Sequence, residues 1–127
     1  MIKTLFNHLI ISFIQLLPQK FTRMFAYKYV AGENTADVLN VIKTLNLKGF
    51  AVTVDILGEH TSDMMTAKNI RQDYEHLITK IDEQNLDCNL SIKPSHLGMD
   101  ISNECVINNM KHILQKASEK NNFIRID

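Results

Sequence analysis

A lysine closes an apolar, strand-like run in the segment SIKPSHLGMD, residues 91–100. Lys93 follows Ile92 directly and precedes Pro94. A fixed ammonium at a partly desolvated strand end is a natural partner for a carboxylate. A lysine in such a place is more often a solvated surface charge, and a buried lysine can also form a Schiff base. No buried environment in the sequence favours the Schiff base, so carboxylate binding and a surface charge remain the two main interpretations.

Acidic residues stand near the ends of two other strand-like runs. Asp55 lies in FAVTVDIL, residues 50–57, and Asp127 ends FIRID, residues 123–127. Together with DCNLSIK, residues 87–93, these runs start about 36 residues apart, and a helix-length segment fills each gap. A repeated strand–helix unit predicts a parallel sheet with right-handed crossovers. In such a sheet Asp55, Lys93 and Asp127 lie near one another at one edge.

Helical spacing and capping residues define the intervening segments. Asn34 or Thr35 can cap a first helix, which stops at Gly49. Thr61 or Ser62 can cap a second helix, and Ser102 can cap a third. The expected apolar stripes are Val38, Val41, Ile42 and Leu45 in the first helix, Ala67, Ile70, Tyr74, Leu77, Ile78 and Ile81 in the second, and Val106, Met110, Ile113, Leu114 and Ala117 in the third.

Alternation along the strands indicates which kind of parallel sheet this is. Each strand has one aliphatic face, such as Cys88, Leu90 and Ile92, and one face that turns polar towards the carboxyl end. A doubly wound sheet buries both faces under helices, whereas a (β/α)8 barrel turns its polar strand ends to an open mouth. The sequence therefore predicts an α/β fold, with residues 1–49 as an N-terminal helical segment. Residues 50–127 are expected to form an incomplete (β/α)8 barrel, truncated after its third parallel strand.

Composition restricts the functional classes. Fourteen basic residues balance fourteen acidic ones, which argues against a sequence-independent nucleic-acid binder. The two cysteines, Cys88 and Cys105, form no CxxC pair, so a reduced, cytoplasmic setting is expected, with Cys88 as an inert core thiol. His96 and Glu59 could meet as metal ligands, but no close ligand spacing occurs. Surface positions are the expectation for the histidines, and no metal is predicted. Met64 and Met65 are expected in a loop or in core packing.

The first residues allow two interpretations. LFNHLIISFIQLLP, residues 5–18, is strongly apolar, but it lacks a small-residue cleavage site and is shorter than a membrane-spanning helix. It is expected to be a helix packed on the body of the protein. The alternative is a helix lying on a membrane surface, with Lys20, Arg23 and Lys28 beyond it.

With these segments in place, the chain from Tyr29 to Asp127 resembles the opening of the monofunctional proline dehydrogenases. The resemblance lies in an ordered set of pieces: VAGE before the first helix, DILGE at the first strand, LSIKPSHLG at the second and RID at the third. It implies a barrel that holds FAD and oxidises L-proline to 1-pyrroline-5-carboxylate by hydride transfer, with a quinone as the electron acceptor.

The resemblance also assigns roles to residues. It implies that Lys93 pairs with the proline carboxylate, that Asp127 supports the substrate pocket, and that Glu59 takes part in an ion pair that gates the mouth. The resemblance gives Asp55 a supporting role. Pro94 departs from the family pattern, where leucine is common, and removes an amide donor there.

Relatives draw the arginines that clamp the proline carboxylate, and most FAD contacts, from later strands. We therefore expect an N-terminal fragment of a proline dehydrogenase that is inactive alone, cytoplasmic or peripheral at the inner face of the membrane. The alternative is a non-enzymatic remnant that associates with a partner or a membrane through its apolar first residues.

Overall fold

The computed structural model describes residues 30–127. The predicted helix over residues 5–18, and with it the proposed membrane contact, lies outside the described residues. The chain divides into two compact units between Val38 and Leu39. The predicted boundary between residues 49 and 50 stays a prediction.

The described elements follow the predicted order. They are α3 (Thr35–Leu47), β1 (Val52–Asp55), α4 (Met64–Glu83), β2 (Cys88–Ile92), the short 3-10 helix η1 (Pro94–Leu97), α5 (Asn103–Glu119) and β3 (Ile124–Ile126). Each strand is shorter than the apolar run that predicted it. Phe50 and Phe123, at the starts of those runs, are 59% and 61% exposed and precede the paired residues.

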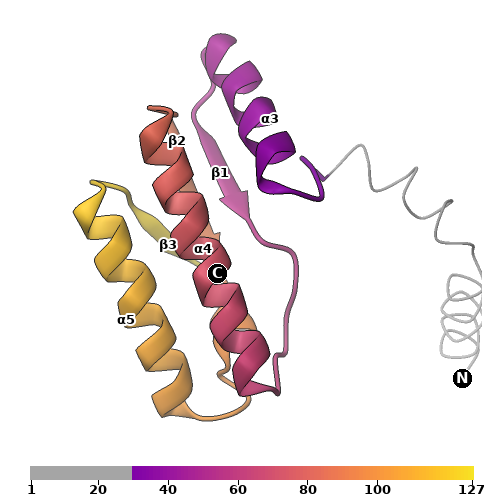
Figure 1. The fold of residues 1–127 in the computed structure, drawn as a ribbon, viewed down its shortest axis with the longest axis vertical. Helices are drawn as coiled ribbons and strands as arrows, with labels where there is room; N and C mark the ends of the chain where they lie inside the picture. Colours follow the sequence, from indigo (N-terminus) through magenta and orange to yellow (C-terminus); the bar gives the residue numbers. More distant parts are fainter. Residues whose placement is uncertain (1–29) are drawn as a thin grey trace, which may run out of the picture. The chain divides into compact units, whose positions relative to one another are not determined.

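The three strands form one parallel sheet in the order β1–β2–β3. Val54 pairs with Leu90, and Leu90 pairs with Ile124, so equivalent positions of the three strands lie side by side. Helices α4 and α5 lie next to each other along one face of this sheet (Figure 1). The prediction of parallel strands joined by helical crossovers is confirmed.

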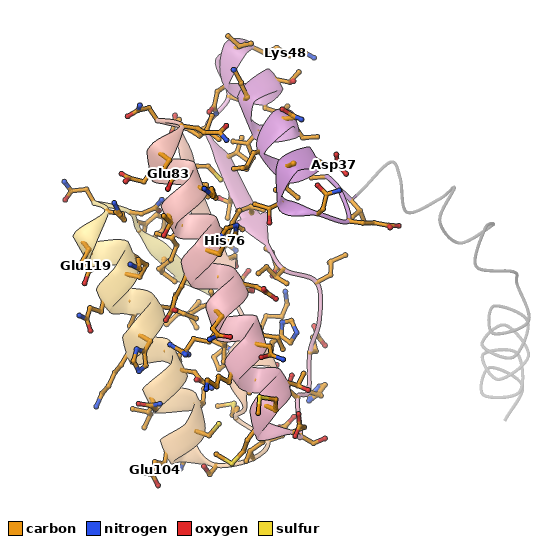
Figure 2. The ribbon with its side chains drawn as sticks, in the orientation of Figure 1. Asp37, Lys48, His76, Glu83, Glu104 and Glu119 are labelled. Carbon is orange, nitrogen blue, oxygen red and sulfur yellow. The ribbon has the colours of Figure 1, made fainter. Side chains whose placement is uncertain are left out.

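The stripe predicted for α4 is confirmed at every position. All six residues are buried, and Tyr74, Ile78 and Ile81 are 0%, 0% and 1% exposed. Leu90 and Ile92 of β2 are fully buried as well. Burying a side chain of this size contributes about 1.5–3 kcal/mol. The opposite side of these helices is charged, and His76, Glu83, Glu104 and Glu119 are exposed there (Figure 2).

The stripes of α3 and α5 differ from the prediction at their margins. In α3 the buried pair is Leu39 and Ile42, and Val41 is 37% exposed, because it lies one helical step away from Ile42. In α5 Leu114 is 43% exposed for the same reason, next to the buried Ile113. Asn109 takes a buried position instead and donates to the Leu97 carbonyl at 3.0 Å.

Two of the three predicted helix caps are confirmed. Asn34 accepts from the Asp37 amide at 3.0 Å, and Ser102 from the Cys105 amide at 3.1 Å. The prediction for α4 is wrong, because its cap is Asp63, which accepts from the Thr66 amide at 2.7 Å. Thr61 is buried in the preceding loop, where its amide donates to the Ser95 carbonyl at 3.1 Å.

Sulfur-containing residues were predicted correctly in one case and not in the other. Cys88 is buried and unpaired, and burial raises the pKa of its thiol to about 11, as expected of an inert core thiol. Met64 and Met65 are 67% and 62% exposed at the start of α4 and do not contribute to a core. The first turn of α4 precedes its buried stripe, so these side chains face solvent.

The cap at Asp63 leads to a test. Asp63→Ala should lower the thermal midpoint of the chain, because the first-turn amides of α4 lose their acceptor. Ser62→Ala, one residue away, should leave the midpoint within error. Circular dichroism of both variants makes the measurement, and equal effects of the two substitutions would contradict the cap assignment.

Candidate active site

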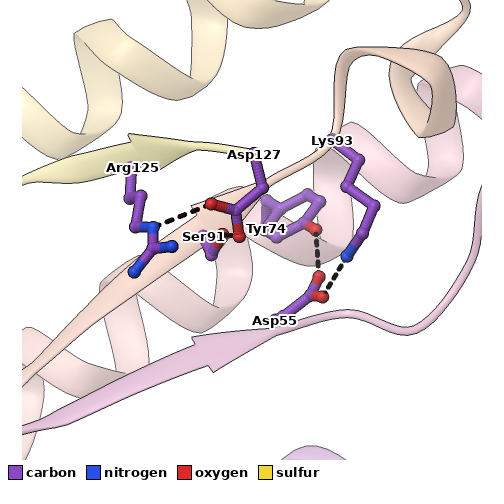
Figure 3. A network of polar contacts seen from close by, with 6 residues as sticks. All are labelled: Asp55, Tyr74, Ser91, Lys93, Arg125 and Asp127. Atoms are coloured by element: carbon purple, nitrogen blue, oxygen red, sulfur yellow. Dashed lines mark hydrogen bonds and ion pairs between the residues drawn. The ribbon is translucent and has the colours of Figure 1, made fainter.

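The carboxyl ends of β1 and β2 bring a carboxylate and an ammonium together. Asp55 is the last residue of β1, and Lys93 follows the last residue of β2. Lys93 Nζ donates to Asp55 Oδ2 in an ion pair (Figure 3). The two side chains are 25% and 29% exposed, so the pair is partly desolvated but still open to a ligand.

A tyrosine from the helix layer completes the contacts of Asp55. Tyr74 has its ring in the core, and its hydroxyl donates to Asp55 Oδ1 at 3.3 Å (Figure 3). Burial, followed by the charge of Asp55, raises the pKa of the Tyr74 hydroxyl well above its usual range. It therefore stays a neutral donor at any physiological pH. Sequence reasoning placed Tyr74 in the apolar stripe and missed this polar function.

The end of β3 adds a second carboxylate. Ser91 Oγ donates a hydrogen bond to Asp127 Oδ2, and Arg125 Nε donates to Asp127 Oδ1 at 2.7 Å (Figure 3). The Asp127 amide continues the sheet by donating to the Ile92 carbonyl at 3.0 Å. The Ser91 hydrogen bond, Arg125 and the charge of Lys93 hold the pKa of Asp127 below its usual value, so it is ionised at neutral pH.

Lys93 is held in its charged form. The hydrogen bond to Asp55 is the main reason that its pKa lies above the usual value, and Glu59 and Asp127 add to the effect through space. The segment after it begins with Pro94 in the first position of η1, where a missing amide donor costs little and the fixed φ suits the turn. Lys93 itself is extended, with φ −109° and ψ 120°.

Glu59 lies outside this hydrogen-bonded cluster. It is exposed on the loop between β1 and α4, and its influence on Lys93 is electrostatic. Of the four predicted site residues, the strand ends thus bring Asp55, Lys93 and Asp127 together and leave Glu59 apart. Ser91 and Arg125 could have been added from strand alternation, because they share the polar face with Lys93 and Asp127.

One histidine departs from the expected surface positions. His60, His76 and His112 are exposed, but His96 is 7% exposed. Its ring lies against Gly58, where no side chain takes up the space. Within residues 30–127, no three His, Cys, Asp or Glu side chains lie close enough together to hold a metal ion.

The contact between Tyr74 and Asp55 is open to a double-mutant cycle. Tyr74→Phe should lower the free energy of unfolding by about 0.5–1.5 kcal/mol, because the ring stays and the hydrogen bond is lost. In an Asp55→Ala background the same substitution should cost less, because the hydroxyl has already lost this acceptor. Urea unfolding measures both, and an equal cost in the two backgrounds would argue against the contact.

Comparisons with known proteins agree on one family. The sequence model of the proline dehydrogenase family matches residues 38–127. Proline dehydrogenase 1 of Bacillus subtilis subsp. natto is 31% identical over 106 residues, which are 84% of this chain and 35% of that protein. Proline dehydrogenase 2 of Bacillus subtilis strain 168 is 33% identical over 106 residues, with the same two shares. The chain thus spans about a third of the length of these relatives.

A solved structure shares the fold. Proline utilization A from Bdellovibrio bacteriovorus, crystallised after inactivation by N-propargylglycine, matches with a TM-score of 0.67 and 22% identity. The match covers 77% of this chain and 13% of that one. None of the helices in residues 30–127 is long and apolar enough to cross a membrane. The family model and the relatives together establish that the chain belongs to the proline dehydrogenase family.

Proposed function

We propose that this chain supplies the first part of the catalytic barrel of a proline dehydrogenase. In this function L-proline is oxidised to 1-pyrroline-5-carboxylate in proline catabolism, and the electrons pass from FAD to a quinone. Family membership supports the reaction class, and one observation carries the assignment to a site. A charged lysine is fixed by a carboxylate at the carboxyl ends of parallel strands.

The barrel itself is part of the proposal. Residues 50–127 would be its first three strands and the helices between them, with the strand ends Asp55, Lys93 and Asp127 at the mouth. Two features support this arrangement: the strands are parallel in sequence order, and their polar row is separate from the aliphatic row under α4 and α5. Enzymes with this fold place their active sites at the carboxyl ends of the strands.

Lys93 would pair with the proline carboxylate. An ammonium has three donors, and the contact with Asp55 uses one of them, so Lys93 can bind a second carboxylate without leaving the first. Asp55 and Tyr74 would keep the ammonium in place before the substrate arrives, which lowers the ordering cost of binding.

The remaining carboxylates would act on the rest of the substrate. Asp127, ionised and held by Ser91 and Arg125, would support the pocket and attract the secondary ammonium of proline. Glu59, on the exposed loop after β1, is in a position to meet a cation from another part of the barrel and so to gate the mouth.

FAD, when bound, would accept the hydride. The strand-end cluster fits the amino acid better than it fits the cofactor. It contains the cations Lys93 and Arg125 and the carboxylates Asp55 and Asp127, so it has no net positive charge with which to attract a pyrophosphate. We therefore assign most flavin contacts to residues other than these.

The role of Lys93 can be tested in a chimera in which residues 38–127 replace the matching segment of Proline dehydrogenase 1 of Bacillus subtilis. Lys93→Met should lower kcat/KM for proline about 10- to 100-fold, mainly through KM, because a charge-assisted contact is lost. Proline-dependent dye reduction gives the rates, and flavin absorbance reports folding.

Lys68→Met is the matched control, because Lys68 is exposed on α4 and, within residues 30–127, forms no hydrogen bond or ion pair with Asp55, Lys93 or Asp127. A flavin-loaded chimera whose KM for proline is the same with and without Lys93 would refute the assignment. For the 127-residue chain alone we expect no flavin absorbance and no proline-dependent dye reduction. Flavin that bleaches with proline would show that these residues suffice for the whole site.

A further inference from the structure

Three contacts fasten the loop between β1 and α4, residues 56–63, to the segment that follows β2. Gly58 packs against the ring of His96, and the Thr61 amide donates to the Ser95 carbonyl at 3.1 Å. His60 Nδ1 lies 2.9 Å from Asp100 Oδ2. All three join positions more than 30 residues apart in the chain, so the two loops form one unit.

The contact between Gly58 and His96 leaves no spare room. A Cβ on Gly58 would lie 2.2 Å from His96 Nε2 and 2.4 Å from Cε1, and the φ of +151° at this position suits glycine alone. The ring is 7% exposed, and its Nδ1 is buried without a hydrogen-bond partner. His96 thus occupies the space of a side chain that the loop lacks, and its position decides where the loop can lie.

The third contact is made at the surface. His60 has a left-handed backbone, with φ of 52°, and its side chain is 75% exposed. It reaches from the β1–α4 loop to Asp100, which lies between η1 and α5. The ion pair needs a protonated imidazole, whereas the buried ring of His96 is best accommodated as a neutral one.

We propose that His96 is a positioning residue. Together with the His60–Asp100 ion pair, it holds the loop that carries Glu59 closed against the loop that begins at Lys93. This closure is strongest in a window of mildly acidic to neutral pH. The closure itself is inferred from the three contacts described above. Its effect on substrate, through a Glu59 held near the mouth of the barrel, rests on the proposed function.

The two histidines set the two sides of the window. Asp100, by hydrogen bond and charge, raises the pKa of His60 above 6.5, and Glu59 adds to the effect. The contribution of this ion pair is therefore complete below pH 6.5 and is lost as pH rises through the raised pKa.

For His96 the sign is opposite. Burial lowers its pKa below 6.5; the charge of Lys93 acts in the same direction, and Asp55, Glu59 and the Ile56 backbone act against it. Its packing against Gly58 is therefore complete above pH 6.5 and is lost as pH falls through the lowered pKa. Closure is greatest around pH 6.5, where both contacts are present.

Hydrogen exchange of the Thr61 amide in the 127-residue chain tests this, since that amide is protected only while it donates to Ser95. Its protection factor, corrected for the intrinsic pH dependence of exchange, should pass through a maximum between about pH 5 and 8 and fall severalfold on each side. His96→Gln should remove the fall on the acidic side, and His60→Gln the fall on the alkaline side. Gly58→Ala should lower protection at every pH.

His76→Gln is the matched control, because His76 is exposed on α4, and it should leave the profile unchanged. The Leu90 amide in β2 serves as the internal reference for global stability. The proposal would be overturned if the protection factor of the Thr61 amide changed monotonically with pH or followed that of the Leu90 amide. It would also be overturned if the wild type and His96→Gln had the same Thr61 profile. Because hydrogen exchange needs neither proline nor flavin, this experiment tests the loop closure separately from the proposed function.

Discussion

The parallel pairing of β2 with β1 on one side and β3 on the other is the constraint on which the rest of the structure depends. Parallel neighbours cannot be joined by a tight turn, so the chain has to cross back after each strand, and α4 and α5 are those crossings. Their apolar stripes are buried against one face of the sheet, which explains why Leu90 and Ile92 are fully buried. The same pairing gathers all carboxyl ends at one edge, so polar residues there become neighbours.

At that edge the charges alternate across the strands. The carboxylate of Asp55 on β1 is followed by the ammonium of Lys93 after β2 and the carboxylate of Asp127 after β3. Each partly desolvated charge has a hydrogen-bonding partner, which offsets the cost of removing it from water. Tyr74 and Ser91 add donors from the core and from the sheet, so the side chains are held before any ligand is present. In the proposed function, this preorganised charge pair would receive the carboxylate of a small zwitterionic substrate.

The loops at this edge depend on a second, steric constraint. Gly58 and His96 fit together because one residue has no side chain and the other has a ring of the right size. Single-sequence reasoning treated His96 as a surface residue and Thr61 as a helix cap, and both assignments were wrong for the same reason. Both residues are used in contacts between loops that lie far apart along the chain, and local patterns carry no information about such contacts. Tyr74 was missed in the same way, because its position on α4 fits an apolar stripe and only its hydroxyl contacts Asp55, 19 residues away.

By itself the sequence determined the order of helices and strands, the buried face of α4, the parallel sheet and the meeting of Asp55, Lys93 and Asp127 at one edge. These follow from local periodicity and from the geometry of crossovers, which leave little freedom once the strands are recognised. Only the tertiary structure decided that Asp63 rather than Thr61 or Ser62 caps α4, that Tyr74 serves the charged cluster, and that His96 lies buried against Gly58. Those outcomes depend on which of several competing contacts each residue makes in the folded chain. Space decides the position of His96, and hydrogen bonds decide the roles of Asp63 and Tyr74.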